Sequence, residues 1–480
     1  MEDGLPQSWM KVQLGDVLSS IIGGGTPSKD REDYFQGDIP LMTVKDMRSR
    51  RPSGTGFNIT AEALANSSAK LVPADTLVIA TRMGLGKIVR APFETAINQD
   101  LKALFPAEGM DKSFVEFWFL SMAQRIEAMG TGTTVKGIRL NGLAGLDFPL
   151  PLSEEQRRIV EKIEVLFVQL DKGEEAVRQV QGLLKRYRQS VLKAAVTGAL
   201  TADWRAENRD KLDHGRDLLA RILDTRRETW AGRSRYKEPV TPDTSDLPEL
   251  PEGWVWAAVD AVGEVTTGAT PASAKKDAFF GGDIPFLKPT DLDQGALVAE
   301  AREFLTDAGA DASRTVRKGA VLVTCIGATT GKTGVNRFDR AAFNQQINAV
   351  EPFDTVALGD YLYWVFVGSA FQAQIWANAA ATTLPIINKS KFSRLPVPVP
   401  SVAEQSVIVA VVEAQLARAD ELERLCETEL ARASALRQSI LKQAFAGRLV
   451  PQDPADEPAS ALLARIRAAA PGKKTRKAKA

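Results

Sequence analysis

The feature that most constrains this sequence is an internal duplication. The segment LPQSW at residues 5–9 returns as LPEGW at 250–254, and AINQDLKALFP at 96–106 returns as AFNQQINAVEP at 342–352. A period of about 245 residues is far longer than that of a solenoid repeat, so the repeated unit is a whole domain with its connector. Further matched pairs keep the same order along the chain: 24–47 with 267–292, 148–156 with 395–405, 189–200 with 438–449, and LLARI at 218–222 with 462–466.

The first part of each half favours a β-rich domain. Short β-branched runs separated by glycine, VPADTLVIATRMGLGKIV at 72–89 and RKGAVLVTCIGATTGKTGV at 317–335, each predict two strands joined by a turn. An apolar segment follows in each half, at 113–129 and at 359–376, and each predicts one helix.

After each β-rich segment the apolar residues take up a heptad spacing. From Ser153, a candidate N-cap, they alternate by four and three, which predicts a long coiled-coil helix ending near Gly198. A weaker copy ends near Gly447. A helix of about 45 residues would be roughly 65–70 Å long, so each copy needs a long partner, and the other copy provides it. The predicted seam consists of Ile159, Ile163, Leu166, Leu170, Val177, Val180, Leu184, Tyr187, Val191, Ile408, Val412, Leu422, Leu436 and Ile440.

These patterns predict an α+β fold. Two β-rich domains related by pseudo-twofold symmetry would be joined by two long antiparallel coiled-coil helices. The expected order is a β-rich domain at 1–152, a long helix at 153–200, a connector with a short helix at 201–245, a second β-rich domain at 246–402, a second long helix at 403–447, and a tail with a short helix at 448–480.

The composition excludes several kinds of site. The 61 lysines and arginines balance 60 aspartates and glutamates, so net charge alone does not indicate a nucleic-acid partner. One histidine, His214, is too few for a histidine-based metal or acid–base site, and the distant Cys325 and Cys426 suit neither a disulfide framework nor a zinc site. We therefore expect no metal and no cofactor. The sequence also lacks a signal-peptide pattern and an apolar membrane-spanning window, so we expect a protein of the reducing cytoplasm.

The duplicated motifs resemble those of the specificity subunit of Type I restriction–modification systems. The resemblance rests on the L-P-x-x-W segments, G-x-T-P-S before G-D-I-P, the G-x-T-x-G-K turn, and the helix ending Q-S-V/I-L-K-x-A-x-x-G. It implies a non-catalytic subunit that reads a bipartite double-stranded DNA target with a fixed gap, one half-site for each target-recognition domain. It also implies a scaffold for two methyltransferase subunits and, in the full complex, two translocating restriction subunits, with no membrane partner.

Two other functions stay open from the residues alone. The first is a nucleic-acid-dependent enzyme that binds a nucleoside triphosphate with the Gly327–Thr333 loop. A Walker A loop has four residues between its glycines, whereas three separate Gly327 from Gly331, so a turn between strands is favoured. The second is a coiled-coil scaffold that does not read DNA. Methyl transfer by this chain is disfavoured because the sequence has no D/N-P-P-Y/F motif.

Candidate DNA contacts lie in the loops around the repeated landmarks. Loop cations would contact phosphates, and the amides of Asn98-Gln99 and Asn344-Gln345 suit adenine, although their presence in both halves favours a structural role. The basic tail at 473–480 is interpreted as a solvated end, with a weak DNA contact as the alternative. The candidates are Ser28, Lys29, Arg31, Lys45, Arg82, Lys87, Asn98, Gln99, Ser273, Lys275, Lys276, Lys288, Thr329, Lys332, Asn344 and Gln345.

Overall fold

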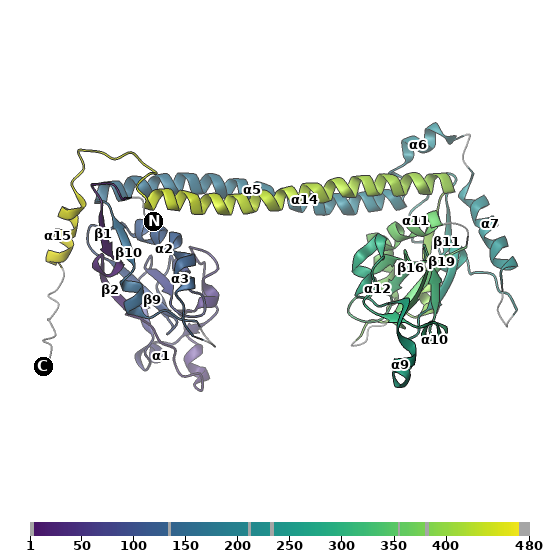
Figure 1. The fold of residues 1–480 in the computed structure, drawn as a ribbon, viewed down its shortest axis with the longest axis horizontal. Helices are drawn as coiled ribbons and strands as arrows, with labels where there is room; N and C mark the ends of the chain where they lie inside the picture. The colour runs from purple at the N-terminus through teal and green to yellow at the C-terminus, as the bar shows by residue number, and fades with distance from the viewer. Residues whose placement is uncertain are drawn as a thin grey trace. The chain divides into compact units, whose positions relative to one another are not determined.

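The structure is a computed structural model that forms two compact units (Figure 1). Unit 1 comprises Met1–Val177 with Glu427–Ala480, and unit 2 comprises Arg178–Cys426. Each unit contains one β-rich domain and a part of each long helix. The basic tail lies outside the described residues, which are 4–132, 136–209, 213–230, 235–353, 356–379 and 384–469.

The β domain of unit 1 is built from two four-stranded sheets and a two-stranded ribbon. The core lies between these sheets and the helices around them, and it buries Trp118 and Phe148. Strands β3 (Ile39–Met42) and β8 (Thr95–Ile97) are parallel, with Leu41 opposite Ala96, and the other strand pairs are antiparallel. The strand orders are β2(Leu18–Gly23)-β9(Leu101–Pro106)-β6(Leu77–Ala80)-β7(Ile88–Arg90), β4(Asn58–Ile59)-β3(Ile39–Met42)-β8(Thr95–Ile97)-β5(Lys70–Val72), and β1(Met10–Gln13)-β10(Asp147–Leu150).

The β domain of unit 2 repeats this topology strand for strand. Its parallel strand pair is β13 (Phe280–Leu287) with β18 (Arg340–Phe343), where Phe286 lies opposite Ala342. The two predicted strand–turn–strand segments are confirmed as β6–β7 and β16–β17. The orders are β12(Gly263–Thr267)-β19(Ile347–Pro352)-β16(Val321–Thr324)-β17(Thr333–Val335), β14(Phe304–Leu305)-β13(Phe280–Leu287)-β18(Arg340–Phe343)-β15(Thr315–Arg317), and β11(Val255–Ala258)-β20(Pro396–Val399).

Within each β domain, strand β9 or β19 is followed by two helices where the sequence predicted one. The first pair breaks at Met122 and the second at Gly368, which is the N-cap of the following helix. These helices are α2 (Lys112–Ser121) and α3 (Ala123–Ala128) in unit 1, and α11 (Val356–Val367) and α12 (Ser369–Asn378) in unit 2. Shorter helices are α1 (Ala61–Ala65), α4 (Leu140–Ala144), α8 (Val259–Val262), α9 (Lys276–Phe279), α10 (Asp307–Asp311) and α13 (Lys389–Ser393).

Short helices outside the β domains pack back onto them. The connector contains two helices, α6 (Ala202–Glu207) and α7 (Gly215–Glu228), where one was expected. The repeated LLARI segments lie in α7 and in α15 (Ala459–Ala469). Leu218 and Ile222 of α7 join the core of unit 2, and Leu462 and Ile466 of α15 join that of unit 1, so the repeated segment has the same role in each unit.

The two long helices are α5 (Ser153–Val196) and α14 (Val402–Phe445), each of 44 residues. They run antiparallel, because α5 leads out of unit 1 and α14 leads back into it. Ser153 is the first helical residue and not the N-cap, and its hydroxyl donates to the carbonyl of Gly109 at 2.9 Å. Gly198 follows the end of α5 with φ of +72°, as its predicted position at the helix end requires.

The predicted seam residues differ in burial. Ile159, Ile163, Leu184, Val191, Ile408, Val412 and Ile440 are at most 7% exposed, and Leu166, Leu170 and Val177 are half-buried. Val180, Tyr187, Leu422 and Leu436 are 40–47% exposed, although the Tyr187 hydroxyl donates to the Gln415 side-chain oxygen of α14 at 3.3 Å.

The residue after Val180 and the residue after Tyr187 lie closer to the seam. Gln181 and Arg188 are both half-buried. The less exposed positions of α5 are therefore Val177, Gln181, Leu184, Arg188 and Val191, at alternating spacings of four and three residues. Arg188 reaches Asp420 and Glu423 of α14, each at 2.7 Å. Hydrophobicity alone does not identify Arg188, because its contact with α14 is an ion pair.

The same ion-pair arrangement occurs in both units. In unit 1, Arg437 of α14 contacts Asp171 at 2.5 Å and Glu174 at 2.9 Å on α5. Arg188 and Arg437 directly precede the repeated Q-S segments, so they are equivalent residues of the two copies.

Candidate DNA interface

In each β domain, the G-x-T-P loop lies against the repeated Asn-Gln turn. In unit 1 the Gly25 amide donates to the Ile97 carbonyl at 3.1 Å, and the Thr26 hydroxyl donates to the Gln99 side-chain oxygen. In unit 2 the Thr270 hydroxyl donates in the same way to Gln345. The duplicated sequence therefore builds the same pair of loops twice.

The β6–β7 turn of unit 1, residues 81–87, lies beside this pair of loops. The Thr81 amide donates to the Asp100 carbonyl at 2.8 Å, and the Arg82 guanidinium lies 3.6 Å from the Asp100 carboxylate. A Cβ on Gly84 would lie 2.6 Å from the side chain of Val44, so the turn also approaches the segment that carries Lys45. We call residues 24–26, 44–46, 81–87 and 98–102 loop cluster 1.

Loop cluster 1 is cationic. Lys45, Arg82 and Lys87 are exposed, and the Lys102 ammonium donates to the Gln99 carbonyl at 3.3 Å. Burial lowers the pKa of Lys102, and the nearby Arg82 charge lowers it further against the opposing effect of Asp100. A phosphate group would relieve the repulsion between these cations, because it offers charge-assisted hydrogen bonds to both.

Three other predicted residues of unit 1 lie on a separate turn. Ser28 and Lys29 are exposed, and the Ser28 carbonyl accepts from the Arg31 amide at 3.4 Å. Arg31 pairs with Asp33 at 2.6 Å and lies over the Tyr34 ring at 4.3 Å. The structure therefore holds the Arg31 guanidinium within its own turn.

The predicted amides of Asn98 and Asn344 are buried and bonded within their turns. The Asn98 side-chain oxygen accepts from the Asp100 amide at 3.1 Å, and its nitrogen donates to the Asp100 carboxylate at 3.3 Å. Asn344 makes the equivalent bonds to Gln346. These contacts agree with the structural role favoured for the repeated pair, and a DNA contact by either asparagine remains only a prediction.

Loop cluster 2, the equivalent loops of unit 2, carries fewer available cations. Lys332 pairs with Asp293 at 2.6 Å, and Lys288 pairs with Glu303. Ile326 is equivalent to Arg82, because each residue forms an isolated β-bridge just after the inner strand of its sheet, β16 or β6. The remaining predicted residues of unit 2, Ser273, Lys275, Lys276 and Thr329, are exposed.

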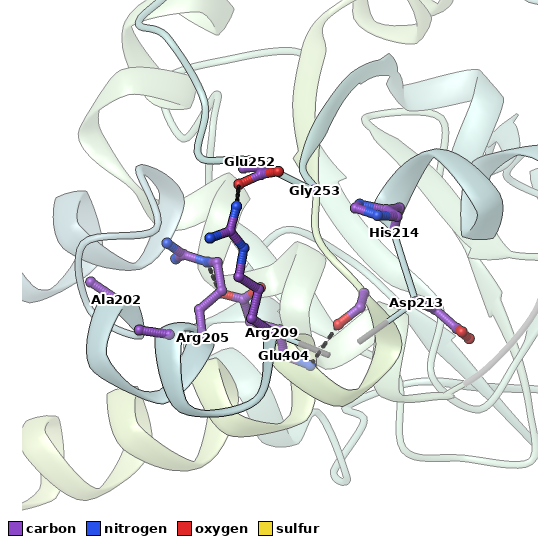
Figure 2. A pocket seen from close by; sticks show the side chains of 10 residues that line it. Ala202, Arg205, Arg209, Asp213, His214, Glu252, Gly253 and Glu404 are labelled. Atoms are coloured by element: carbon purple, nitrogen blue, oxygen red, sulfur yellow. Dashed lines mark hydrogen bonds and ion pairs between the residues drawn. The ribbon is translucent and has the colours of Figure 1, made fainter. Parts of the chain in front are cut away.

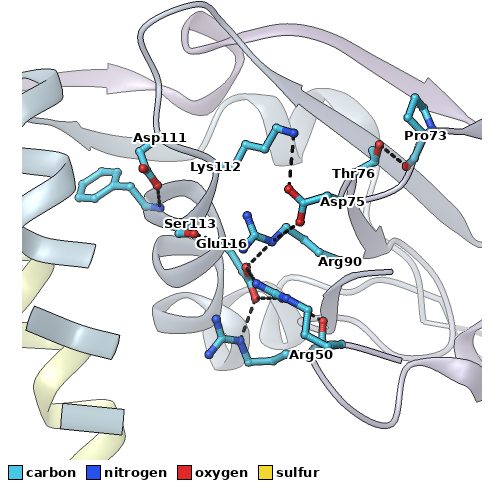
Figure 3. A network of polar contacts seen from close by, with 11 residues as sticks. Arg50, Pro73, Asp75, Thr76, Arg90, Asp111, Lys112, Ser113 and Glu116 are labelled. Atoms are coloured by element: carbon cyan, nitrogen blue, oxygen red, sulfur yellow. Dashed lines mark hydrogen bonds and ion pairs between the residues drawn. The ribbon is translucent and has the colours of Figure 1, made fainter. Parts of the chain in front are cut away.

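A buried acidic residue that the sequence analysis did not identify organises unit 1 (Figure 3). Glu116 of α2 is fully buried and accepts bonds from Arg50 at 2.8 Å and Arg51 at 2.9 Å, and Arg90 lies 3.0 Å away. Burial alone would raise the pKa of Glu116, but the bond from Arg51 and the charge of Arg50 hold it below its usual range. A lone glutamate within the apolar run FVEFWF is the sequence signal that indicates it.

A cavity of about 510 Å³ in unit 2 lies where the helix ends meet the β domain (Figure 2). On its wall, Arg205 donates to Glu404 at 2.9 Å, and Arg209 pairs with Glu252 at 2.7 Å. The Trp254 indole also donates to Glu404, at 2.8 Å. These charges are paired with one another, so the cavity is a structural joint.

Unit 1 has an equivalent joint. The Trp9 indole donates to Glu155 at 2.8 Å, as Trp254 does to Glu404. These tryptophans belong to the repeated L-P-x-x-W segments, and each glutamate lies in the first turn of the long helix that follows. The motif therefore fixes the start of each helix to its own β domain.

Across the described ranges of the chain, no group of histidine, cysteine and acidic residues has the arrangement of a metal site. Within the same ranges, no helix combines the length and apolar character that crossing a membrane requires.

Two β domains of one topology, each with a loop cluster and a joint to a long helix, define a duplicated two-domain architecture. The sequence profile described as "Type I restriction modification DNA specificity domain" matches residues 6–177 and 251–431, and the chain belongs to this family. It is 27% identical to the Type I restriction enzyme EcoDI specificity subunit of Escherichia coli, and 25% identical to the StySPI specificity subunit of Salmonella potsdam. Each match covers 99% of both chains.

Solved structures share the fold. The HsdS subunit from Thermoanaerobacter tengcongensis is 19% identical, with a TM-score of 0.54 over 93% of this chain and 99% of that chain. A chain described under complex assembly and conformational transition of the type I R-M system is 18% identical, with a TM-score of 0.64 over 93% of this chain and 100% of that chain. The predicted α+β fold with two β-rich domains and long helices is confirmed.

Proposed function

We propose that this chain is the DNA-specificity subunit of a Type I restriction–modification complex and that each β domain reads one half of a bipartite target. One observation carries the proposal: the joints of the two halves match, whereas the side chains of the two loop clusters differ. Trp9–Glu155 and Trp254–Glu404 are equivalent, but Arg82 and Met83 are replaced by Ile326 and Gly327. Such divergence on a common scaffold fits two loop sets that read different bases.

The partners in this proposal are double-stranded DNA, two methyltransferase subunits and two restriction subunits. Methyl transfer and ATP-dependent cleavage would belong to the partner subunits, as in the family. Both cysteines are free and buried, which fits assembly in the reducing cytoplasm. The candidate contacts with the strongest support are Lys45, Arg82 and Lys87, because they are exposed in one cationic cluster.

The nucleotide-binding alternative has little support. The Gly327–Thr333 loop is the turn between β16 and β17, and a strand follows it where a phosphate-binding loop requires a helix. Its Lys332 already pairs with Asp293 at 2.6 Å.

A domain exchange tests the proposal. Residues 1–152 would be replaced by the corresponding domain of a relative, and modified bases would be mapped in a genome that carries the variant with its methyltransferase partner. We expect one half of the target to change and the other half to persist. The control exchanges residues 246–402 and should change the other half. A target that changes in both halves would contradict modular reading, and an unchanged target would favour the scaffold that does not read DNA.

We infer further that the long helices set the gap between the half-sites. One extra helical turn near Gly198, with a matching turn near Gly447, adds about 5 Å to each helix, which corresponds to one or two base pairs at about 3.4 Å each. Methylation mapping should find a longer gap between unchanged half-sites. An unchanged gap would refute the role of the helices as the ruler.

A further inference from the structure

Met83, at the tip of the β6–β7 turn in loop cluster 1, has an unusual backbone. Its φ is +56°, and across the described part of the chain it shares a positive φ only with Asp75 among residues other than glycine. This left-handed region is unfavourable for a side chain with a Cβ atom. Such conformations occur preferentially at functional sites.

Packing does not explain why a methionine occupies this position. The side chain is 66% exposed, one of the most exposed large apolar side chains in the described structure. The equivalent turn of unit 2 has Gly327 there, with φ of +106°, one residue after Ile326 just as Met83 follows Arg82. The turn can therefore be made by glycine without strain, and the methionine adds an apolar group in solvent.

The surroundings of Met83 are cationic. Arg82 is half exposed on one side of it, and Lys87 is exposed at the other end of the turn. The Met83 amide donates to the carbonyl of Lys136 at 3.4 Å, and Lys136 is also exposed. An apolar tip flanked by cations matches a ligand with anionic edges and an apolar group between them, such as a thymine methyl between the phosphates of the DNA major groove.

We propose that Met83 is a specificity-determining residue of the first β domain. Its flexible thioether packs against the apolar surface of a base in one half-site, while Arg82 and Lys87 contact the flanking phosphates. Unit 2 lacks this contact, because Gly327 has no side chain. The inference rests on the proposed function and adds to it the residue and the kind of contact that read one position.

The test uses the full chain with its methyltransferase partner and a duplex of the sequence that genome methylation mapping identifies. In Met83→Asn the side chain is polar, but asparagine tolerates the left-handed backbone. We expect binding to weaken about 5- to 150-fold, as for loss of a single base contact worth about 1–3 kcal/mol. Preference should relax at one position of one half-site, and the melting temperature should be unchanged. Met83→Leu should retain most of the affinity.

Two further variants separate a DNA contact from a structural role. Met83→Gly should raise the melting temperature, because it removes the strain, and still weaken DNA binding. Val240→Gly, in the connector and similarly exposed at 59%, should leave the affinity unchanged. Wild-type affinity and preference in Met83→Asn and Met83→Gly would overturn the assignment of Met83. If the wild-type complex itself showed no bipartite preference, the proposed function would fail instead.

Discussion

Replacement of Glu116 by glutamine tests whether one buried carboxylate holds the arginine-rich loop at 48–57. Glu116→Gln keeps the volume of the side chain but removes the charge that Arg50, Arg51 and Arg90 share. Loss of one partner of a fully buried ion pair costs about 3–5 kcal/mol. Arg50 and Arg51 are 36% and 41% exposed and regain water, so each of their pairs contributes only about 0–1 kcal/mol.

The surroundings of Arg90 determine the rest of the loss in unfolding free energy. It is 12% exposed and keeps Asp75 at 3.3 Å when the glutamate charge is removed. We therefore expect Glu116→Gln to lower the free energy of unfolding of unit 1 by about 2 kcal/mol, between the buried and the exposed limits. For a unit of this size, that corresponds to a melting temperature about 4–8 °C lower.

The assay combines thermal unfolding with limited trypsin digestion, because Arg48 and Arg50 are cleavage sites in the loop, whereas Pro52 blocks cleavage after Arg51. Glu116→Gln should be cleaved there faster than the wild type. The control is Glu127→Gln, an exposed glutamate on α3, which should change neither measurement. Equal melting temperatures and equal cleavage rates for the two variants would refute the assigned role of Glu116.

Further predictions concern acid and the long helices. Since the folded pKa of Glu116 is below its usual value of 4.5, its stabilisation is complete above that pH and is lost as the pH falls through the folded pKa. The stability difference between wild type and Glu116→Gln should therefore stay constant from pH 7 down to about pH 4.5 and shrink as the pH falls further. Leu184→Asp buries an unpaired charge and should lower the free energy of unfolding by about 3–5 kcal/mol. Its control, Leu183→Asp, lies at a position 55% exposed and should lower it by under about 0.5 kcal/mol. Equal effects of the two variants in urea unfolding would contradict the seam. In Gly198→Ala the new methyl group meets a left-handed backbone and a proline ring, so the protein should be destabilised by about 1–3 kcal/mol. Gly182→Ala has open space around it and should stabilise the protein by about 0.5–1 kcal/mol. The reverse order would refute the role of Gly198 in ending α5.

Regular patterns in the sequence predicted the repeated parts of the fold. The start of α5 at Ser153 and the β6–β7 and β16–β17 pairs could be predicted because spacing and glycine positions depend on local geometry. The half-buried position of Arg188 between the helices could not be predicted, because hydrophobicity favours its neighbour Tyr187, whereas ion pairing across the helices favours Arg188.

The candidate site was predicted only in part for a similar reason. Loop cations such as Lys45 and Arg82 can be identified by type, but the sequence does not show that Arg31 and Lys332 are paired with nearby acids. The backbone conformation of Met83 also has no sequence signature, because it depends on the turn around it.

The repeated ion pairs of the long helices bear on how such a chain could arise. Arg188 with Asp420 and Glu423, and Arg437 with Asp171 and Glu174, use equivalent residues, so each half carries both sides of the contact. A polypeptide with a single half would thus present a self-complementary helix, the condition for a symmetric dimer. The contacts between the two long helices are therefore those expected of a symmetric homodimer whose two copies have been joined into one polypeptide. Joining the halves frees each loop cluster to change alone, which a dimer of identical chains, limited to palindromic targets, cannot do.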